Sequence, residues 1–416
     1  MFFDYIQLFL IYIFYKFYLL DYSSMVKKII LKLSTTNILF VKMFQWFSYD
    51  FIDKILCDEE EINLFLKNCL NKVTYNEDEI DREELNNLIQ KCKEDNKTLT
   101  IEDNPSNSGT IALAFKGKLD DKNIIIKIRR TRIVDKINEN MNDIQFISNL
   151  LNTFFSNEAI KEASNFLFFN KETILNQIDF NLELKNSKIF EKKYKTATSV
   201  IVPKMYCNYS NQNLIVMDYI DNINENIDNL TIEENKIYLL LIIKFTYNSI
   251  VFKKILHCDM HLGNILFIKN LNNETNNVEY KIGIIDYGIC LELDVKDQNF
   301  VDKTFTECMV NFNLYNVFVE VMNHLKDKYN DKTNHELILE EIKTFVDKNN
   351  FETTFMSHYD VYTFLKITRK HNLNIPQKIY NMLLAFVSFL GTASKFLSVF
   401  KTHEEKLIFM KKNWQL

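Results

Sequence analysis

The alternation of apolar and polar residues changes character along the chain. Between residues 26 and 95, apolar positions recur at helical spacing among Lys, Glu and Asn, and the runs DEEEINLFLKNCL and DREELNNLIQKC begin with acidic residues that favour a helix N-terminus. A turn-rich segment at 103–109 follows, and after it TIALAFKGKL and IIIKIRR flank the polar LDDKN as the strands of a β-hairpin. The pattern therefore predicts a helical N-terminal part followed by a β-rich part.

The rest of the chain is predicted to be largely helical. A helical tract covers 135–194, and the β-rich runs 200–205 and 213–220 follow it. An apolar helix at 232–256 leads to two short apolar strands separated by the Asn-rich run NLNNETNN, which we interpret as an exposed hairpin loop. Helical spacing then continues through the remaining residues.

Both ends of the sequence carry apolar stretches. Residues 1–24 are strongly apolar and aromatic, but Asp4, Gln7 and Lys16 interrupt them, so the longest clean run is well below the ~18 residues of a membrane span. An interfacial membrane anchor and an aromatic helix packed on the protein are both open interpretations. A cleavable signal peptide is not expected, because no basic region precedes the run. Residues 381–400 are long enough to span a membrane, but their helical spacing predicts a buried helix.

Composition narrows the class of protein. Of 416 residues, 47% are apolar and 25% are charged, which excludes a wholly disordered, collagen-like or polytopic membrane chain. The 50 basic and 55 acidic residues give a net charge of −5, which offers no electrostatic support for nucleic-acid binding. Seven widely spaced cysteines without a CxxC pair predict an intracellular, reducing compartment and no disulfide framework.

The most informative segment for function is HCDMHLGN, residues 257–264. Phosphoryl transfer needs a carboxylate beside the nucleophile and an amide oxygen that holds a metal, and the kinase catalytic loop supplies them as Asp and Asn five positions apart. Asp259 and Asn264 have this spacing. Downstream, an apolar strand ends in Asp286-Tyr287-Gly288, where the carboxylate would bind the Mg²⁺ that bridges the phosphates and the aromatic ring would pack beneath it.

Together, HCDMHLGN and IIDYGI resemble the HxDxHxGN and Asp-Phe-Gly pair of the UbiB/ADCK family of atypical protein-kinase-like proteins. The resemblance covers about 35–400. It implies an α+β, two-lobed protein-kinase-like fold with an N-terminal helical extension, and the cofactors ATP and Mg²⁺. The segments expected are an apolar segment (1–24), a helical extension (25–100), an N-lobe with a helical insertion (101–220) and a C-lobe (221–416).

Lys127 lies in the middle of the run IIIKI, where the kinase lysine contacts the α and β phosphates. Its isoleucine neighbours indicate a buried strand, and a buried lysine needs a partner; the alternative is an exposed strand lysine. By resemblance, QIDFNLELKN looks like the family's ExD-x4-Glu helix, which makes Glu183 the ion-pair partner and Asp179 the second acidic position. The sequence departs from the family at Gln177, which replaces the first glutamate.

Three segments have looser resemblances. The run NLIVMDYI is similar to the strand and hinge that hold adenine, with contacts from the backbone N–H and C=O groups of Asp218, Tyr219 and Ile220. The run KMFQ resembles the family's KxGQ motif, with Phe in place of Gly, and by that resemblance Lys42 and Gln45 would lie over the active site and disfavour protein substrates.

The third is the phosphate loop, residues 104–112, which has one glycine where ordinary kinases have three and where the family has an alanine-rich loop. Here Ser108, Gly109 and Thr110, with Ser106, are expected to offer backbone N–H groups to phosphate.

The main hypothesis is an atypical kinase or ATPase that binds Mg-ATP and transfers the γ-phosphate to a non-protein acceptor or water. Asp286 and Asn264 would ligate the metal, Lys127 paired with Glu183 would orient the phosphates, and Asp259 would position the nucleophile. An APE-like stop is not recognisable after the Asp-Tyr-Gly motif, so a conventional protein substrate groove is not expected. The resemblance implies work at a membrane surface, with a lipid or isoprenoid quinone precursor as partner.

Three alternatives stay open. A small-molecule phosphotransferase of the aminoglycoside or choline kinase type shares the His-x-Asp loop, although the helical extension and KMFQ argue against it. A nucleotide-independent pseudokinase, acting as a scaffold or lipid-binding adaptor, would tolerate Gln177, Phe44 and the missing glycines, although it has no need for the retained charged residues. A hydrolase would use His257 and His261 around Asp259 as a metal cluster.

Overall fold

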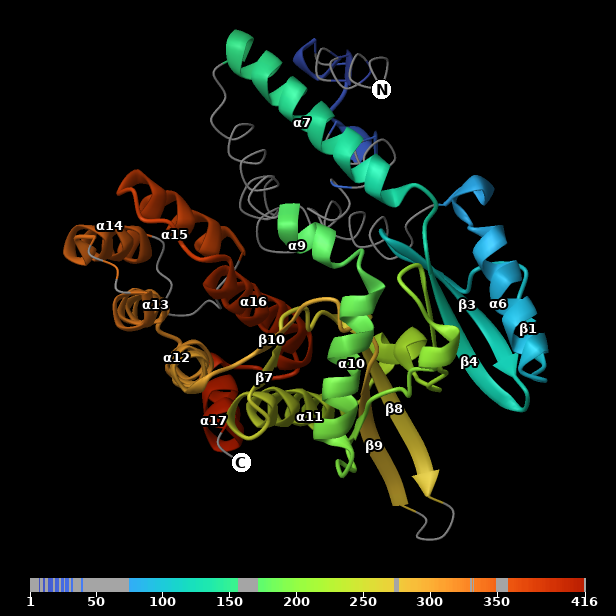
Figure 1. The fold of residues 1–416 in the computed structure, drawn as a ribbon. Coiled ribbons are helices and arrows are strands. Elements are labelled where there is room, and N and C mark those ends of the chain that lie inside the picture. Colours follow the sequence, from blue (N-terminus) through green and yellow to red (C-terminus); the bar gives the residue numbers. More distant parts are fainter. Residues whose placement is uncertain are drawn as a thin grey trace. The chain divides into compact units, whose positions relative to one another are not determined.

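The computed structural model describes residues 75–155, 171–272, 277–329, 331, 333–348 and 358–414, together with scattered residues between 7 and 39. Contacts within the chain divide it into two compact units (Figure 1). The first comprises Met1–Leu184 with Lys204–Tyr219, and the second comprises Lys185–Pro203 with Ile220–Leu416. The predicted helical extension is described only in part, with a short 3₁₀ turn at Glu77–Glu79 and the helix α6 (Arg82–Glu94).

The first unit is built on an antiparallel five-stranded sheet. Its strands are β1 (Leu99–Ile101), β2 (Asn107–Ser108), β3 (Ala112–Leu119), β4 (Lys122–Arg129) and β6 (Leu214–Asp218). The order is β1-β3-β4-β6, and β2 pairs with the start of β3. The predicted hairpin is confirmed, because Leu119 pairs with Lys122 across a two-residue turn.

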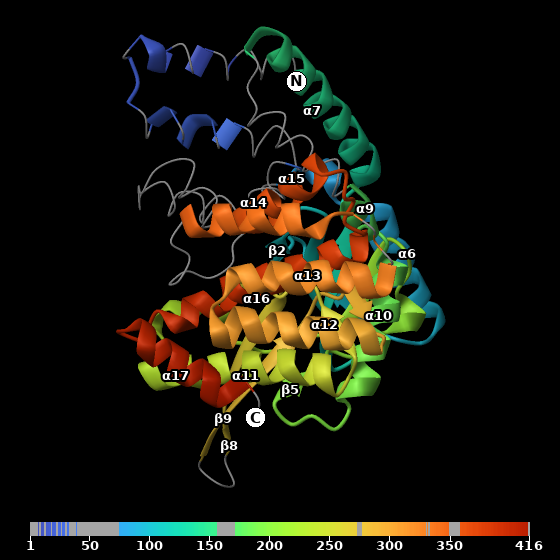
Figure 2. The same cartoon turned by 90° about the vertical axis from the view of Figure 1, so that its left-hand side faces the viewer.

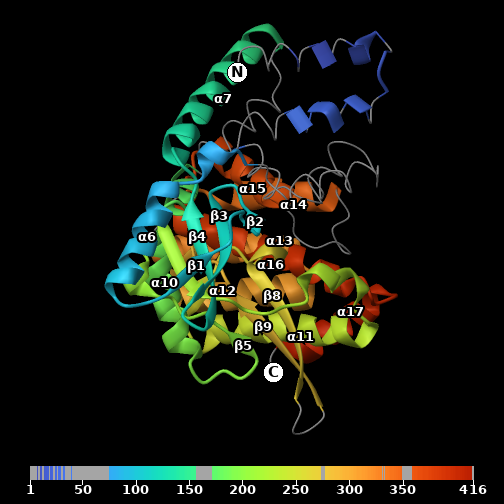
Figure 3. The same ribbon diagram turned by 90° about the vertical axis from the view of Figure 1, so that its right-hand side faces the viewer.

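Alternate residues of β4 form the apolar face of the sheet that α6 covers. Ile124, Ile126 and Ile128 are completely buried and pack in one cluster with the apolar side of α6 (Figure 3). Successive strand side chains point to opposite faces, so Lys127 projects from the other face of the sheet. Three isoleucines around this lysine thus belong to the hydrophobic core of the unit.

The helical tract predicted over 135–194 is interrupted in the structure. Its described helices are α7 (Ile133–Phe155), α9 (Lys171–Asn176) and α10 (Phe180–Tyr194). The break before α10 has a local cause: the Asp179 side chain accepts a hydrogen bond from the backbone N–H of Asn181 at 3.0 Å, as an N-capping residue does. Periodicity alone did not show this new helix start.

The second unit combines short strands with a helical bundle. The strand β5 (Val200–Ile201) pairs in parallel with β9 (Asn277–Ile284), which pairs with β8 (Ile265–Asn272), and β7 (Ile255–His257) pairs with β10 (Cys290–Glu292). The β8–β9 hairpin is the predicted one, although its strands reach further into the Asn-rich run than expected, with Asn272 opposite Asn277.

The helices of the second unit are α11 (Ile232–Val251), α12 (Val295–Thr306), α13 (Leu314–Tyr329), α14 (His335–Lys348), α15 (His358–Lys370), α16 (Gln377–Leu397) and α17 (His403–Trp414). Short helical turns occur at Cys207–Tyr209 of the first unit and at Asn224–Asn229, Leu262–Asn264 and Glu307–Asn311 of the second. The helices α12 and α13 lie side by side (Figure 2), and α16 packs on α11 and α15.

The helix α16 occupies the centre of this unit. Among the residues that the structure describes, it is the one helix whose length and composition would allow it to cross a membrane, and 72% of its most apolar stretch is buried inside the protein. Its Phe386 and Phe389 rings pack on Phe305 of α12 with centroid separations of 4.3 and 5.4 Å. The prediction of a buried apolar helix near the end of the sequence is confirmed.

Candidate active site

The first unit contains the predicted ion pair between strand and helix. Lys127 Nζ lies 2.8 Å from each carboxylate oxygen of Glu183, and the side chains are 16% and 1% exposed. Glu183 sits in the first turn of α10, where the positive end of the helix dipole favours a carboxylate. Lys127 also lies over the Phe180 ring at 5.3 Å from its centroid. The ammonium group is therefore held in one position by a charged partner and an aromatic face.

The two other positions of the predicted acidic motif have different surroundings. Asp179 caps α10, so its carboxylate has a structural task at the helix that carries Glu183. Gln177 is buried in the turn between α9 and α10. The change from glutamate to glutamine thus falls at a buried position two residues before the cap.

The predicted phosphate loop folds back on itself. Three of its four expected donors are already used inside the hairpin: the N–H groups of Ser106, Ser108 and Gly109 donate to the Ala114 carbonyl, the Asn107 side chain and the Ala112 carbonyl. Thr110 is buried. The structure therefore does not support the expected role of the Ser106, Ser108 and Gly109 N–H groups as phosphate donors, because bonds within the hairpin already use them; the role of the Thr110 N–H stays a prediction.

A buried arginine holds this loop in place. Arg130 Nη2 donates to Ser108 Oγ and Gly109 O, each at 2.8 Å, and its Nη1 binds Glu79, which also binds Lys136. Burial alone would raise the pKa of Glu79, but the two cations outweigh it and hold the pKa below its ordinary value. Sequence reasoning missed this network, because Glu79 and Arg130 are 51 positions apart and no pattern joins them.

The second unit contains the predicted catalytic loop, which is held by its own histidine. The backbone N–H of Asp259 donates to His257 Nδ1 at 3.2 Å, and His257 Nε2 bonds the Asp286 carbonyl oxygen. The first bond needs an unprotonated Nδ1 and the second a proton on Nε2, so we assign the neutral Nε2–H tautomer. Burial lowers the pKa of His257 and agrees with this assignment. One neutral ring thus joins the two acidic residues through their backbones.

Asn264 closes the same loop. Its Nδ2 donates to the Asp259 carbonyl oxygen at 2.9 Å, which orients the amide. The N–H of Ile285 donates to the Asn264 carbonyl oxygen at 3.2 Å, so Asn264 and Asp286 lie at adjacent ends of the paired strands β8 and β9. A carboxylate and an amide oxygen are the hard ligands that Mg²⁺ prefers. The donor set of these two residues fits this metal.

Tyr287 lies beneath this loop, as the sequence predicts for the aromatic residue of the motif. It is fully buried, its hydroxyl donates to the Ile284 carbonyl at 2.7 Å, and its ring centroid lies 5.1 Å from that of Phe190. Asn186 Nδ2 donates to the Tyr287 carbonyl, and the Gly288 N–H donates to Asp286 Oδ1 at 2.9 Å. The turn that carries the Asp286 carboxylate is therefore fixed from both sides.

The histidines do not form a metal cluster. Both ring nitrogens of His257 are used by backbone groups, and His261 Nδ1 accepts the N–H of Gly263 at 3.0 Å. In the part of the chain that the structure describes, no group of three potential metal-ligating side chains is found. The hydrolase alternative therefore has no support at HCDMHLGN.

Backbone hydrogen bonds occupy two N–H groups of the predicted hinge. The N–H groups of Asp218 and Tyr219 donate to the carbonyls of Lys204 and Asn123 at 3.0 and 3.1 Å. Because these backbone bonds occupy the two N–H groups, the structure does not support them as donors to adenine. The roles of the carbonyl groups and of Ile220 stay predictions. The predicted regulatory residues Lys42 and Gln45 lie outside the described residues.

Comparison with known families agrees with this set of motifs. Residues 72–319, more than half of the chain, match the family described as the ABC1 atypical kinase-like domain. This chain belongs to the ABC1, or UbiB/ADCK, family of atypical kinases. The kinase-like α+β fold that the sequence predicts is thereby confirmed, and a kinase-like enzyme is the class of protein at family level.

Curated relatives of this ABC1 chain are named as kinases. The chain is 24% identical over 213 residues to the probable serine/threonine-protein kinase abkB of Dictyostelium discoideum, a match over 48% of this chain and 30% of that protein. It is 25% identical over 214 residues to the probable protein kinase UbiB of Histophilus somni (strain 129Pt), over 49% of this chain and 38% of the relative. The chain therefore spans well under half the length of these two relatives.

Two solved structures are similar to the ABC1 chain at a low level. One is the Rv3197–erythromycin complex of Mycobacterium tuberculosis, with a TM-score of 0.39, 16% identity and coverage of 72% of this chain and 76% of that one. The other is the Rio2 kinase of Chaetomium thermophilum in an ADP/Mg²⁺-phosphoaspartate complex, with a TM-score of 0.34, 10% identity and coverage of 92% and 96%.

Proposed function

We propose that this protein binds Mg-ATP and transfers the γ-phosphate to a non-protein acceptor or to water. The observation that carries the proposal is the single hydrogen-bonded unit formed by Asp259, Asn264 and Asp286 around the neutral ring of His257. A scaffold has no physical need to orient two carboxylates and an amide in this way. The Lys127–Glu183 pair supports the proposal independently from the first unit.

Each residue has a role in this proposal that its surroundings support. Asp286 and Asn264 would hold Mg²⁺, which supplies positive charge to the phosphate oxygens when bound. Lys127, kept charged and aligned by Glu183, orients the phosphates. Asp259 is buried, and its carboxylate positions the nucleophile and accepts its proton. Because the loop at Ser108–Gly109 is closed on itself, we expect it to contribute shape rather than amide donors.

The place of action proposed is a membrane surface inside the cell, with a lipid or isoprenoid quinone precursor as acceptor. Membership of the UbiB/ADCK family suggests this substrate class. In the N-terminal segment, the exposed apolar residues Leu10, Phe14 and Phe17 follow one another at helical spacing and are 42%, 45% and 71% exposed. Such a face suits the boundary between lipid head groups and acyl chains. Flotation with liposomes, with and without residues 1–24, tests this part.

The second candidate is a nucleotide-independent scaffold, which the occupied amides of the phosphate loop and Gln177 would favour. A turnover assay separates the two: the protein is incubated with γ-labelled Mg-ATP in water alone, with vesicles containing a phenolic isoprenoid lipid, and with a mixture of soluble proteins. We expect label in phosphate or lipid, and a loss of about 100-fold or more in Asp259→Asn.

The matched control is Asp347→Asn, since Asp347 is an exposed aspartate on α14 of the same unit. It should keep the turnover of the unmodified protein. Turnover that survives Asp259→Asn would remove Asp259 from the mechanism. Absence of both binding and turnover at millimolar Mg-ATP would establish the scaffold candidate instead.

A further inference from the structure

The helix α16 lies beyond residues 72–319, which match the family, yet it contacts the catalytic loop. Thr392 Oγ donates to the backbone carbonyl of Met260 at 2.7 Å, across 132 positions of sequence. Met260 stands between Asp259 and His261 in HCDMHLGN. A threonine hydroxyl within a helix ordinarily bonds a carbonyl of its own helix one turn earlier. Here it donates instead to the loop that carries the proposed catalytic carboxylate.

This hydrogen bond supports the loop backbone from outside, next to Asp259. At its ends the loop is also held by the Ile289 carbonyl, which accepts from Cys258 N–H, and by Ile285 N–H, which donates to the Asn264 carbonyl. The Asp259 N–H is held by His257 and the Asp259 carbonyl by Asn264, and both partners belong to the loop itself. The next carbonyl, that of Met260, is held by Thr392 from a distant helix. Both Met260 and Thr392 are buried, and a buried carbonyl without a donor is costly.

A small cavity lies between the loop and α16. It has space for about one water molecule and is lined by His257 and Met260 of the loop and by Ala385 and Phe389 of α16. Apolar contacts next to such a void fix position less strictly than a full set of neighbours does. Beside this cavity, the bond from Thr392 is a directional contact between α16 and the loop.

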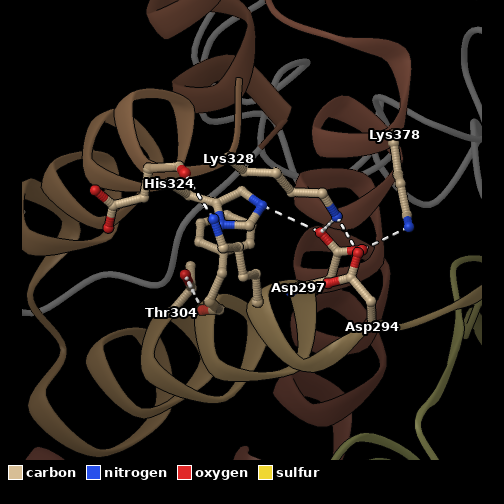
Figure 4. Close-up of polar contacts among 9 residues, drawn as sticks. Asp294, Asp297, Thr304, His324, Lys328 and Lys378 are labelled. Atoms are coloured by element: carbon tan, nitrogen blue, oxygen red, sulfur yellow. Dashed lines mark hydrogen bonds and ion pairs between the residues drawn. The ribbon is translucent and has the colours of Figure 1, made fainter. Parts of the chain in front are cut away.

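The helix is itself fixed at its other end. Lys378 Nζ binds Asp297 Oδ2 of α12 at 2.5 Å, and Asp297, which is completely buried, also accepts from Lys328 and His324 of α13 (Figure 4). Lys378 is in the first turn of α16, where the helix dipole disfavours a cation, so the pairing offsets that cost. Lys378 and Thr392 are about 21 Å apart along the helix at 1.5 Å per residue.

We propose that Thr392 is a positioning residue for phosphoryl transfer: by holding the Met260 carbonyl it sets the height and direction of the Asp259 carboxylate. This inference rests on the proposed function. It assigns α16 to the support of the catalytic loop. It also explains why a helix of this apolar composition carries a fully buried threonine.

The test compares three variants of the full chain. Thr392→Val keeps the shape and removes the donor, Thr392→Ser keeps the donor, and Ser388→Ala is the control. Ser388 lies one turn earlier on α16, and its hydroxyl has no hydrogen-bond partner among the described residues. Steady-state turnover of Mg-ATP and hydrogen exchange of the peptide covering residues 257–264 are measured for each variant.

We expect Thr392→Val to lower kcat about 10- to 100-fold, since a displacement of about 1 Å has effects of this size. The KM for ATP should stay within about twofold, because the nucleotide contacts are unchanged. Exchange in the loop should rise. Thr392→Ser should restore kcat and slow exchange, and Ser388→Ala should match the unmodified protein in both readouts.

The exchange readout separates failure of this inference from failure of the proposed function. If the unmodified protein turns over ATP but Thr392→Val has the same kcat, or loses activity only through a general fall in stability that Thr392→Ser does not rescue, the positioning role is wrong. If the unmodified protein has no turnover, the proposed function fails. Loop exchange that is equal in Thr392→Val and Ser388→Ala would then refute the contact itself.

Discussion

Asp297 is a fully buried carboxylate that accepts hydrogen bonds from three basic side chains. We therefore expect its substitution to lower the stability of the folded protein strongly. Asp297→Asn preserves the shape and removes the charge. One of the two carboxylate oxygens becomes an NH₂ group, which then faces an existing donor, either Lys378 on one side or Lys328 and His324 on the other. Lys328 keeps its ion pair with Asp294, whereas the Asp297 pair is the one ion pair of Lys378 among the described residues, and Asp294 acts on Lys378 only from a longer distance.

The expected loss of unfolding free energy follows from the burial of Asp297. Removal of one partner of a buried ion pair costs about 3–5 kcal/mol, and the cost here should be lower, about 2–3 kcal/mol, because the two lysines keep some contact with solvent. Their side chains are 19% and 33% exposed. At about 2–4 °C per kcal/mol for a unit of this size, the melting temperature should fall by about 4–12 °C.

The pH dependence gives a second, independent measure. Burial would raise the pKa of Asp297, but hydrogen bonds from Lys328 and Lys378 outweigh it and hold the pKa below its ordinary value of 3.8. A carboxyl group with a depressed pKa in the folded state stabilises fully above its unfolded value and loses that contribution as the pH falls through the folded value. The difference between Asp297→Asn and the unmodified protein should therefore be constant down to about pH 4 and shrink below it.

Calorimetric unfolding at pH 7 and at several values between pH 5 and 3 measures both effects. The control is Asp347→Asn, which changes an exposed aspartate of the same unit and should move the melting temperature by about 1 °C or less. A drop of that same small size in Asp297→Asn, or a difference between the proteins that stays unchanged down to pH 3, would refute this account of the cluster.

Two further variants test the contacts of the first unit. Glu183→Gln should weaken Mg-ATP binding by about tenfold or more in calorimetric titration, since a hydrogen bond to a charged group is worth about 1.5–3 kcal/mol; an unchanged dissociation constant would contradict the role of the pair. Glu79→Gln should loosen Arg130 and speed hydrogen exchange at residues 106–112 at pH 7, with no such rise in Glu102→Gln, a change at an exposed site; equal exchange in the two variants would show that Arg130 does not depend on Glu79.

Local pattern predicted the elements whose residues are close in sequence. The hairpin around Asp120 and Asp121, the half-buried strand that carries Lys127, and the buried helix α16 all follow from spacing of apolar residues and turn chemistry. The catalytic loop and the Asp-Tyr-Gly turn followed from motif spacing, and the structure adds the neutral tautomer of His257 that joins them. These are short-range relations, which a single sequence can carry.

Contacts between residues far apart in the sequence were not indicated by any local sequence pattern. Glu79 and Arg130 are 51 positions apart, and Thr392 and Met260 are 132 positions apart; a lone buried polar residue in an apolar run does not reveal its partner. The phosphate loop was misjudged for a related reason. Its serine and glycine residues are typical of both an open amide cradle and a closed turn, and the buried Arg130 on the neighbouring strand end favours the closed one.

We propose that Asp286 and Asn264 hold Mg²⁺ for a bound nucleotide. The most direct test is the unfolding temperature of the full chain with ATP in the presence and absence of Mg²⁺, for the unmodified protein, Asp286→Asn and the control Asp347→Asn. A ligand at 100 times its dissociation constant adds about 2.7 kcal/mol of stability. We expect an upward shift that needs Mg²⁺, is lost in Asp286→Asn and is kept in the control. No shift at millimolar Mg-ATP, or an equal shift in Asp286→Asn, would contradict it.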